Sequence, residues 1–317
     1  MEKVFSLLGF LAKHIMDQFY SLNGIISKRW TGNGPLRVPS FNTACTNWLA
    51  FLFLFGFVLF PQIWLVAQAP ADTFRLALSL PVEGRFATTD NLGQLYLITA
   101  QNAIAKYAPD GKLLARYTNN RLGNATGIDA TNPMKVLVWY ADFRTVVFLN
   151  RSLTVLGELN LISAGFPEVR SIASAQDGNL WLYDEVDFQL RKISPAGEKL
   201  QESQALNLLM PARIQITCLR DDGDNVLAAD PDNGLLQFDV YGQFQKMLPW
   251  KGITSFTVEQ NQMSYLAGDS LRIEQLRAFA SRTLALPAAA VQEQVQRWLA
   301  PRRLLVQKPA VLEIWTR

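Results

Sequence analysis

A short motif recurs six times after residue 72 and limits the chain to a repeat architecture. In each copy a turn precedes a short apolar strand, as in Asp90-Asn91-Leu92-Gly93-Gln94-Leu95-Tyr96-Leu97. The turn residues of the six copies are Gly93, Lys135, Gly178, Gly223, Gln262 and Arg302, so successive copies lie 42, 43, 45, 39 and 40 residues apart. A period of about 40–45 residues is typical of four-stranded propeller blades. The sequence therefore predicts an all-β, six-bladed β-propeller of four-stranded antiparallel blades over residues 72–317.

The strands of the first copy can be placed from the apolar runs and the turn residues between them. We expect the innermost strand at residues 85–88, followed by strands at 95–99, 103–107 and 112–117. Pro109-Asp110-Gly111 forms the turn before the outer strand, because proline presets φ and glycine accepts a positive φ.

The last copy is one strand short, and the chain has one strand-like run to spare. The sixth copy ends at Trp315-Thr316-Arg317, whereas residues 73–80 form an apolar run that precedes the first copy and has no place in it. If this run completes the sixth blade, the ring closes and no unpaired sheet edge is left to aggregate. The sequence thus predicts a ring closed by its first strand.

The repeat also resembles a known family. The Asp-x-x-Gly-x-Leu-Tyr-Leu pattern, then a strand and Pro-Asp-Gly, is similar to NHL-type six-bladed propellers over residues 72–317. The family's usual Asn-x-Arg-Ile at the third strand is replaced by Asn102-Ala103-Ile104-Ala105 and Asp187-Phe188-Gln189-Leu190, which makes this a divergent member. The resemblance implies the fold and says almost nothing about function.

A hydrophobic segment precedes the propeller. Residues 48–66 contain no charge and show no polar face, and their length is at the lower end of a membrane span. Lys28, Arg29 and Arg37 precede the segment, so the positive-inside rule places the N-terminus in the cytoplasm and the propeller outside it. We expect three regions: a cytoplasmic or wrongly assigned leader (1–47), an N-terminal hydrophobic signal or anchor helix (48–71), and the propeller (72–317).

Two fates of the hydrophobic segment remain open. Ala69-Pro70-Ala71 offers the small residues of a signal-peptide cleavage site, with cleavage before Asp72. A retained anchor would instead hold the propeller at the membrane through residues 48–66. Either fate gives an exported protein, periplasmic or anchored to the inner membrane with the propeller outside the cytoplasm.

Charge and cysteine content narrow the range of partners. Five basic and two acidic residues precede residue 72, which leaves 25 of each sign in a neutral propeller. Such a domain lacks the positive surface that nucleic-acid binding requires. The only cysteine after residue 72, Cys218, is predicted to be a small buried strand residue.

The sequence offers no catalytic constellation. The single histidine, His14, lies in the leader, so the propeller has no imidazole base and no Ser-His-Asp triad. We therefore expect no catalytic residues, no metal and no cofactor. Asp142, Asp187, Asp232 and Asp269 recur after the second strands, but aspartate favours tight turns, and turns of different blades are too far apart to share a cation.

Four residues are candidates for binding at the mouth of the channel. Arg85 and Arg170 align at the start of the innermost strand, and Arg213 stands near the equivalent place. Guanidinium groups gathered there could bind an anion or an acidic loop of a partner, unless Glu83 and Glu168 neutralise them. Asp129 is the fourth candidate.

These observations favour a non-enzymatic module that binds a protein partner, or serves as a scaffold, in the bacterial cell envelope. Exposure of Tyr140 or Phe143 would indicate a protein-contact patch. The alternative is a channel-centred propeller enzyme or small-ligand binder. The regucalcin-like lactonases are such enzymes and hold a calcium ion with Glu, Asn and Asp; Asn124 and Asp129 stand near the corresponding positions.

Overall fold

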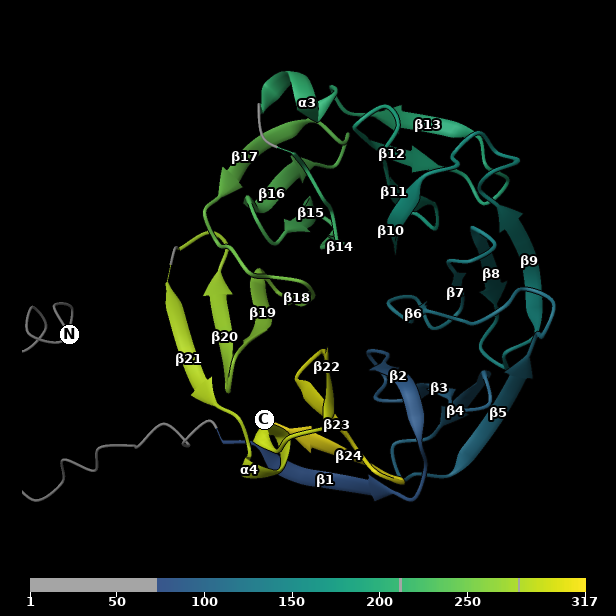
Figure 1. Ribbon diagram of the computed structural model, residues 1–317, viewed down its shortest axis with the longest axis vertical. Helices are drawn as coiled ribbons and strands as arrows, with labels where there is room; N and C mark the ends of the chain where they lie inside the picture. Colours follow the sequence, from purple (N-terminus) through teal and green to yellow (C-terminus); the bar gives the residue numbers. More distant parts are fainter. Residues whose placement is uncertain (1–72, 211–212, 279) are drawn as a thin grey trace, which may run out of the picture. The chain divides into compact units, whose positions relative to one another are not determined.

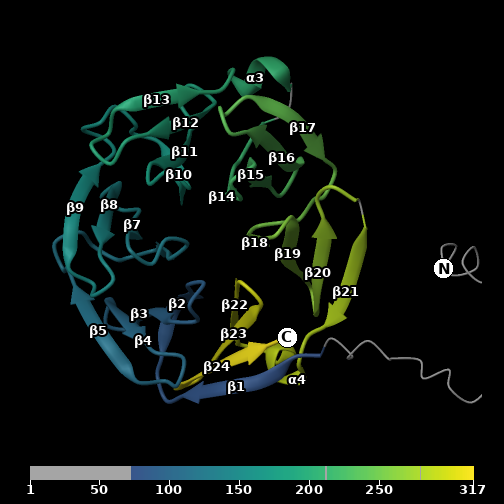
Figure 2. The same cartoon turned by 180° about the vertical axis from the view of Figure 1, so that it is seen from behind.

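Six four-stranded antiparallel sheets form a closed ring in the computed structural model, which describes residues 73–210, 213–278 and 280–317. Figure 1 and Figure 2 show this ring from its two sides, with the sheets in chain order around a common centre. The predicted six-bladed, all-β architecture is confirmed. Residues 1–47 and the hydrophobic segment 48–71 lie outside the described residues. Of the helices described, none has the length and apolar character needed to cross a membrane.

Each blade runs from an inner strand at the channel to an outer strand at the rim. Blades 1 and 2 contain β2 (Gly84–Thr89), β3 (Leu95–Thr99), β4 (Ala103–Tyr107), β5 (Leu113–Thr118), and β6 (Gly127–Asp129), β7 (Val136–Tyr140), β8 (Thr145–Leu149), β9 (Val155–Asn160). Blades 3 and 4 contain β10 (Val169–Ser174), β11 (Leu180–Asp184), β12 (Gln189–Ile193), β13 (Lys199–Glu202), and β14 (Cys218–Asp221), β15 (Asn225–Asp230), β16 (Gly234–Asp239), β17 (Phe244–Leu248).

Blades 5 and 6 contain β18 (Phe256–Glu259), β19 (Gln262–Ala267), β20 (Ser270–Gln275), β21 (Ser281–Ala285), and β22 (Gln296–Ala300), β23 (Arg303–Lys308), β24 (Val311–Thr316), β1 (Arg75–Leu80). Two one-turn helices, α3 (Leu206–Leu209) and α4 (Ala288–Val291), lie in the connections before blades 4 and 6. In blade 1 the observed strands differ from the predicted ranges by one residue at the ends of β2 and β5, which is the ordinary uncertainty of strand ends.

Burial changes systematically from the second strand of a blade to the outer one. Every residue of β3, β7 and β11 is buried, whereas β5, β9 and β13 are mostly exposed. A strand covered by neighbouring sheets on both faces has no polar side, which explains the continuous apolar runs that mark each repeat.

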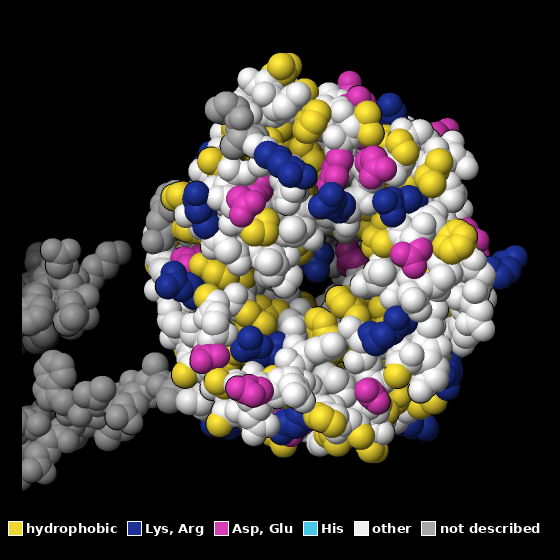
Figure 3. All heavy atoms as spheres, viewed as in Figure 1, with side chains coloured by type: hydrophobic (Ala, Val, Ile, Leu, Met, Phe, Trp, Pro, Cys, Tyr) yellow, Lys and Arg dark blue, Asp and Glu magenta, His cyan; other side chains and the backbone are white. Residues whose placement is uncertain are grey.

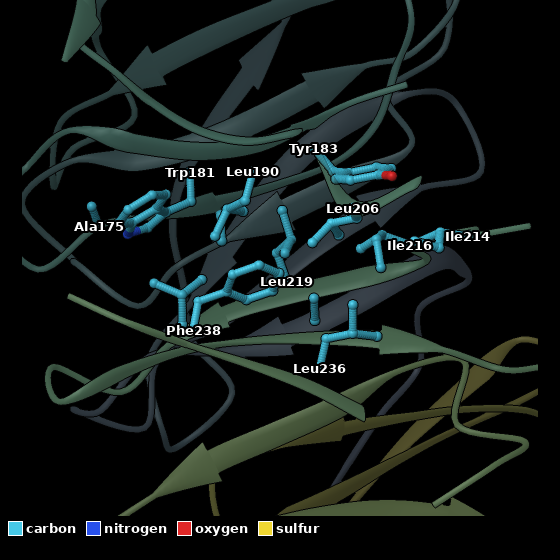
Figure 4. Packing of buried hydrophobic residues seen from close by; sticks show 13 residues of the cluster. Ala175, Trp181, Tyr183, Leu190, Leu206, Ile214, Ile216, Leu219, Leu236 and Phe238 are labelled. Atoms are coloured by element: carbon cyan, nitrogen blue, oxygen red, sulfur yellow. The ribbon is translucent and has the colours of Figure 1, made fainter. Parts of the chain in front are cut away.

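The hydrophobic core lies between neighbouring blades. One cluster joins Trp181 and Tyr183 of β11 to Leu219 of β14 and Phe238 of β16, so blade 3 packs on blade 4 (Figure 4). A second cluster joins blades 1 and 2, and a third joins blades 6 and 1. Each blade therefore buries its apolar faces only when both of its neighbours are present.

The first strand closes the ring as predicted. β1 pairs antiparallel with β24, with Leu78 opposite Ile314 and Leu80 opposite Leu312. The Gln307 side chain ties the same blade to blade 1, because its Oε1 accepts from the Gly84 backbone N–H at 3.0 Å and its Nε2 donates to the Val82 carbonyl at 3.1 Å. The first strand of the propeller thus completes the sixth blade, whose other three strands are the last three of the chain.

Two local predictions are also confirmed. Gly111 has a φ of +89°, and its N–H donates to the Ala108 carbonyl at 2.9 Å, so Pro109-Asp110-Gly111 forms the expected turn. Cys218 is a buried residue with a free thiol at the start of β14.

Buried tyrosines make the stability of the fold sensitive to alkali. For Tyr183, burial raises the pKa of the phenol well above its ordinary value, and Glu185, Asp230 and Asp184 raise it further. The unfolded chain releases this proton near pH 10, whereas the folded chain retains it. The stabilising contribution is therefore complete below pH 10 and is lost as the pH rises towards the folded pKa.

Tyr183→Phe should reduce this alkaline sensitivity. The Tyr183 hydroxyl has no hydrogen-bond partner among the described residues, so the variant should unfold within about 1 kcal/mol of the wild type at pH 7. Above pH 10 its loss of stability should be shallower by about 1.4 kcal/mol per pH unit. Denaturant unfolding at a series of alkaline pH values measures both quantities. An unchanged alkaline slope would contradict the assignment.

Candidate functional site

The inner strands define a channel with two different mouths. β2, β6, β10, β14, β18 and β22 occupy the same position in successive antiparallel blades, so all six run in the same direction along the channel. They begin at one face of the ring, called here the start face, and end at the other, called the end face. Figure 3 shows that the ring is hollowed at its centre.

The three predicted arginines lie towards the start face. Arg85 and Arg170 are the second residues of β2 and β10, and Arg213 lies in the connection that leads to β14. Each of the first two is held within its own blade: Arg85 Nη2 donates to Asn102 Oδ1 at 2.7 Å, and Arg170 Nε lies 2.9 Å from Glu185 Oε1. These contacts direct the two guanidinium groups to neighbours in blades 1 and 3 and not to each other.

The predicted neutralising partners were wrong. Glu168 lies 3.7 Å from Arg144, while Arg170 pairs with Glu185. Arg85 binds the Asn102 amide in place of Glu83. The sequence pointed to glutamates two residues earlier in the chain, whereas the observed partners, Asn102 and Glu185, follow the second strands of their blades.

Asp129 lies at the opposite end of the channel from the three arginines. It is the last residue of β6, and its Oδ1 accepts from the Thr131 N–H at 2.9 Å. Its Oδ2 accepts from the Ser174 N–H of blade 3, also at 2.9 Å. Asp129 therefore ties the inner strands of blades 2 and 3 together, and it does not share a site with Arg85, Arg170 and Arg213.

The end face contains a pocket of about 570 Å³ to which all six blades contribute. Its charged lining consists of four arginines, Arg220, Arg302, Arg303 and Arg317, and three carboxylates, Asp90, Asp129 and Glu259. Thr88 and Thr257 add hydroxyl groups. This volume is within the range of small-molecule sites.

Sequence reasoning missed the pocket arginines. Arg302 lies in the turn of the sixth copy and Arg303 directly after it, and Arg220 stands three residues before the turn residue of the fourth copy. The signal was present, since the turn that follows each inner strand must lie at the end face.

The recurring aspartates lie in separate turns. Asp142, Asp187, Asp232 and Asp269 follow the second strands of blades 2, 3, 4 and 5. The Asp187 carboxylate binds Arg191, and the Asp232 N–H donates to Asp230 Oδ1 at 3.0 Å. Within residues 73–317, as far as they are described, no three His, Cys, Asp or Glu side chains are grouped so that they could hold a metal ion.

The start face exposes a set of large apolar side chains over blades 2 and 3 and the connection from blade 3 to blade 4. Phe143 is 50% exposed, whereas Tyr140, the other candidate for a protein-contact patch, is fully buried. The other members lie in neighbouring connections of the same face. We call this set the start-face patch: Phe143, Ile162, Val186, Phe188, Leu208 and Leu209.

Hydrogen bonds show that the segments of the start-face patch are neighbours. The Leu161 N–H donates to the Arg144 carbonyl at 2.8 Å, which joins the connection after β9 to the turn of Phe143. The Glu185 N–H donates to the Glu168 carbonyl at 3.0 Å, and the Leu206 N–H donates to the Phe188 carbonyl at 2.8 Å. The segments that carry the patch therefore follow one another along an arc from blade 2 to α3.

Comparison with known proteins identifies the fold only. No family model matches the chain, and no curated protein matches it by sequence. The catalytically inactive histidine-to-alanine variant of virginiamycin B lyase from Staphylococcus aureus, solved with quinupristin, is a similar structure: TM-score 0.55, 11% identity, 77% of this chain and 99% of that chain covered. Another is the WD40 domain of Pan2 from Neurospora crassa: TM-score 0.52, 9% identity, 77% and 95% covered.

Proposed function

We propose that the chain is an exported β-propeller of the bacterial cell envelope that binds a protein partner through the start-face patch. Export is inferred from the uncharged segment 48–66 and the basic residues before it. Assignment to the NHL-type propellers likewise rests on the sequence motif. The observation that carries the binding function is the arc of exposed apolar side chains over blades 2 and 3 and the connection to blade 4.

The arc has the composition of a protein-contact surface. Contiguous exposed apolar side chains mark interaction sites, and aromatic residues are common among those that contribute most to binding. Leu208 is 83% exposed and Phe143 is 50% exposed. Exposed apolar residues also occur on the outer strands, for example Leu113 and Leu156, but one or two per rim strand is ordinary for a protein surface.

The two similar structures include both an enzyme and a WD40 domain, and the composition of this chain favours the non-enzymatic role. The lyase is described as inactive once a histidine is replaced by alanine. This propeller contains no histidine, because the single histidine of the chain is His14. WD40 propellers are a widespread scaffold fold, so a role in binding needs no catalytic group.

Replacing Phe143 and Leu208 by serine should abolish capture of the partner. The full-length chain carrying an affinity tag should recover a defined protein from envelope extract, and the double variant should recover at least about 30-fold less, because a few large apolar side chains often contribute about 2 kcal/mol or more to an interface. Leu113→Ser with Leu156→Ser is the matched control, since it removes two similarly exposed apolar side chains from the rim. Equal recovery by both double variants, or no recovery by the wild type, would overturn the proposal.

A further inference from the structure

We propose that the end-face pocket binds a small organic anion, a phosphate or carboxylate compound, through the guanidinium groups of Arg220 and Arg303. This site lies at the opposite end of the channel from Arg85, Arg170 and Arg213. It is also separate from the start-face patch, so it adds a ligand to the proposed function and does not depend on that function.

The carboxylates of the pocket are already satisfied by the fold. Asp90 Oδ1 accepts from the N–H groups of Leu92 and Gln94 at 3.0 and 2.8 Å, and its Oδ2 accepts from the Tyr96 hydroxyl at 3.1 Å. Asp129 accepts from two backbone N–H groups, as described above. Glu259 Oε2 lies 3.1 Å from Arg302 Nε. These three groups therefore hold turns and blades in place; Glu259 also pairs with Arg302, and Asp129 acts electrostatically on Arg220.

Arg220 and Arg303 have donors left over. Arg220 Nη1 donates to the Leu219 carbonyl at 2.8 Å, and Arg303 Nη1 lies 3.4 Å from Thr89 Oγ1. Among the described residues neither guanidinium group lies within salt-bridge distance of a carboxylate, but Cys218 and, to a smaller extent, Asp129 raise the pKa of Arg220. A guanidinium group carries five N–H donors, so each side chain retains several, and both residues line the pocket.

The position of Arg303 is set by the next blade. Its Nη2 would lie 2.6 Å from a Cβ added at Gly93, so the guanidinium group rests directly on the turn between β2 and β3. Arg303 begins β23 of blade 6, so this contact places its positive charge across the boundary between blades 6 and 1. Thr88 and Thr89 of blade 1 line the pocket there. The group is held in place before a ligand arrives, which lowers the entropic cost of binding.

Positive charge is crowded on one side of the pocket. Burial lowers the pKa of Arg317, and two neighbouring guanidinium groups lower it further, that of Arg302 in the pocket and that of Arg282 outside it, while Glu259 raises it. Like charges this close repel, and a bound anion would relieve the repulsion. The four arginines against three carboxylates leave the lining with a net charge of +1.

The rest of the lining indicates the kind of anion. The planar guanidinium group of arginine forms bidentate hydrogen bonds with phosphate and carboxylate groups, which the ammonium group of lysine cannot do. Thr257 and Gln176 can bind hydroxyl groups, while Ile128 and Leu299 present apolar surface to the body of a ligand. A small molecule that combines an anionic group with a short polar or apolar body fits this combination.

Calorimetric titration of the purified full-length chain tests the inference, with glycerol 3-phosphate and succinate as anionic probes and glycerol as the neutral control. At least one anion should bind and raise the melting temperature, glycerol should not bind, and affinity should fall as salt is added. Arg220→Gln and Arg303→Gln should each weaken binding about tenfold or more, since hydrogen bonds to charged groups contribute about 1.5–3 kcal/mol.

Two further variants separate binding from folding. Arg303→Lys retains the charge and should retain part of the affinity, and Arg85→Gln, at the start face, should bind as the wild type does. The melting temperature of each variant without ligand shows whether it folds. Failure of both anions to bind at millimolar concentration overturns the inference. So does equal binding by the wild type, Arg220→Gln and Arg303→Gln. The Phe143 and Leu208 variants of the partner-capture experiment should titrate normally, so the two proposals fail independently.

Discussion

Replacing Arg191 by alanine should lower the free energy of unfolding by about 3–5 kcal/mol. Arg191 lies on β12, and its side chain is 4% exposed. Its Nε lies 3.1 Å from Asp184 Oδ2, its Nη1 donates to Glu202 Oε2 at 2.7 Å, and its Nη2 binds Asp187. Asp187 and Glu202 are exposed and can be hydrated without arginine, but Asp184 is buried and would be left as an uncompensated charge.

The same substitution should also loosen the start-face patch. Asp184 Oδ1 accepts from the Val186 N–H at 3.0 Å, so the network of Arg191 shapes the turn that carries Val186 and Phe188. Chemical denaturation measures the stability change, and partner capture measures the change at the patch. Arg277→Ala is the matched control, because Arg277 pairs with Asp224 on the open surface and its loss should cost at most about 1 kcal/mol. Similar stabilities for the two variants would show that the buried network does not stabilise blade 3.

Leu80→Ala should destabilise the protein by about 2–5 kcal/mol, because it leaves a cavity where the ring closes. Leu80 is the last residue of β1 and is 7% exposed. It belongs to the cluster that contains Leu97 of blade 1 and Leu312 of blade 6, and it lies against the Gly111 turn. Truncation of this one side chain therefore weakens both the packing within blade 6 and the packing of blade 6 on blade 1.

The control for closure lies in the same strand. Leu76 is 49% exposed, so Leu76→Ala should change stability by no more than about 0.5 kcal/mol while it preserves the pairing of β1 with β24. Thermal unfolding of both variants and the wild type gives the comparison. A loss from Leu80→Ala no greater than that from Leu76→Ala would mean that β1 covers the sixth blade without stabilising it.

The fold could be predicted because its determinants are local and repeated. Turn residues such as Gly93 and Gly178 adopt a positive φ, and the strands after them are buried on both faces, so turn chemistry and apolar runs both mark each blade. Closure was predictable from counting strands alone. Because the sixth copy has only three strands of its own, the sequence also indicated which blade the extra strand joins.

The sites could be predicted only in part. Phe143 is exposed as a contact patch requires, but Tyr140, three residues earlier, is buried, because β7 ends between them. Asp129 and the start-face arginines were grouped by their closeness to the channel, yet the direction of the inner strands places them at opposite ends. The contact of Arg303 with Gly93 joins residues 210 positions apart, which no local pattern reveals.

The pairing of Leu80 with Leu312, 232 residues later, also sets the order of events during synthesis. β1 is made before every other strand described, and β24, its only hydrogen-bonded neighbour, is made last. At ~5–20 residues per second, β1 waits roughly 10–50 s for that neighbour. Throughout this time the backbone N–H and C=O groups of β1 are unpaired and can bind strands of other nascent chains. The yield of folded protein should therefore depend on how well the cell protects this strand from such pairing.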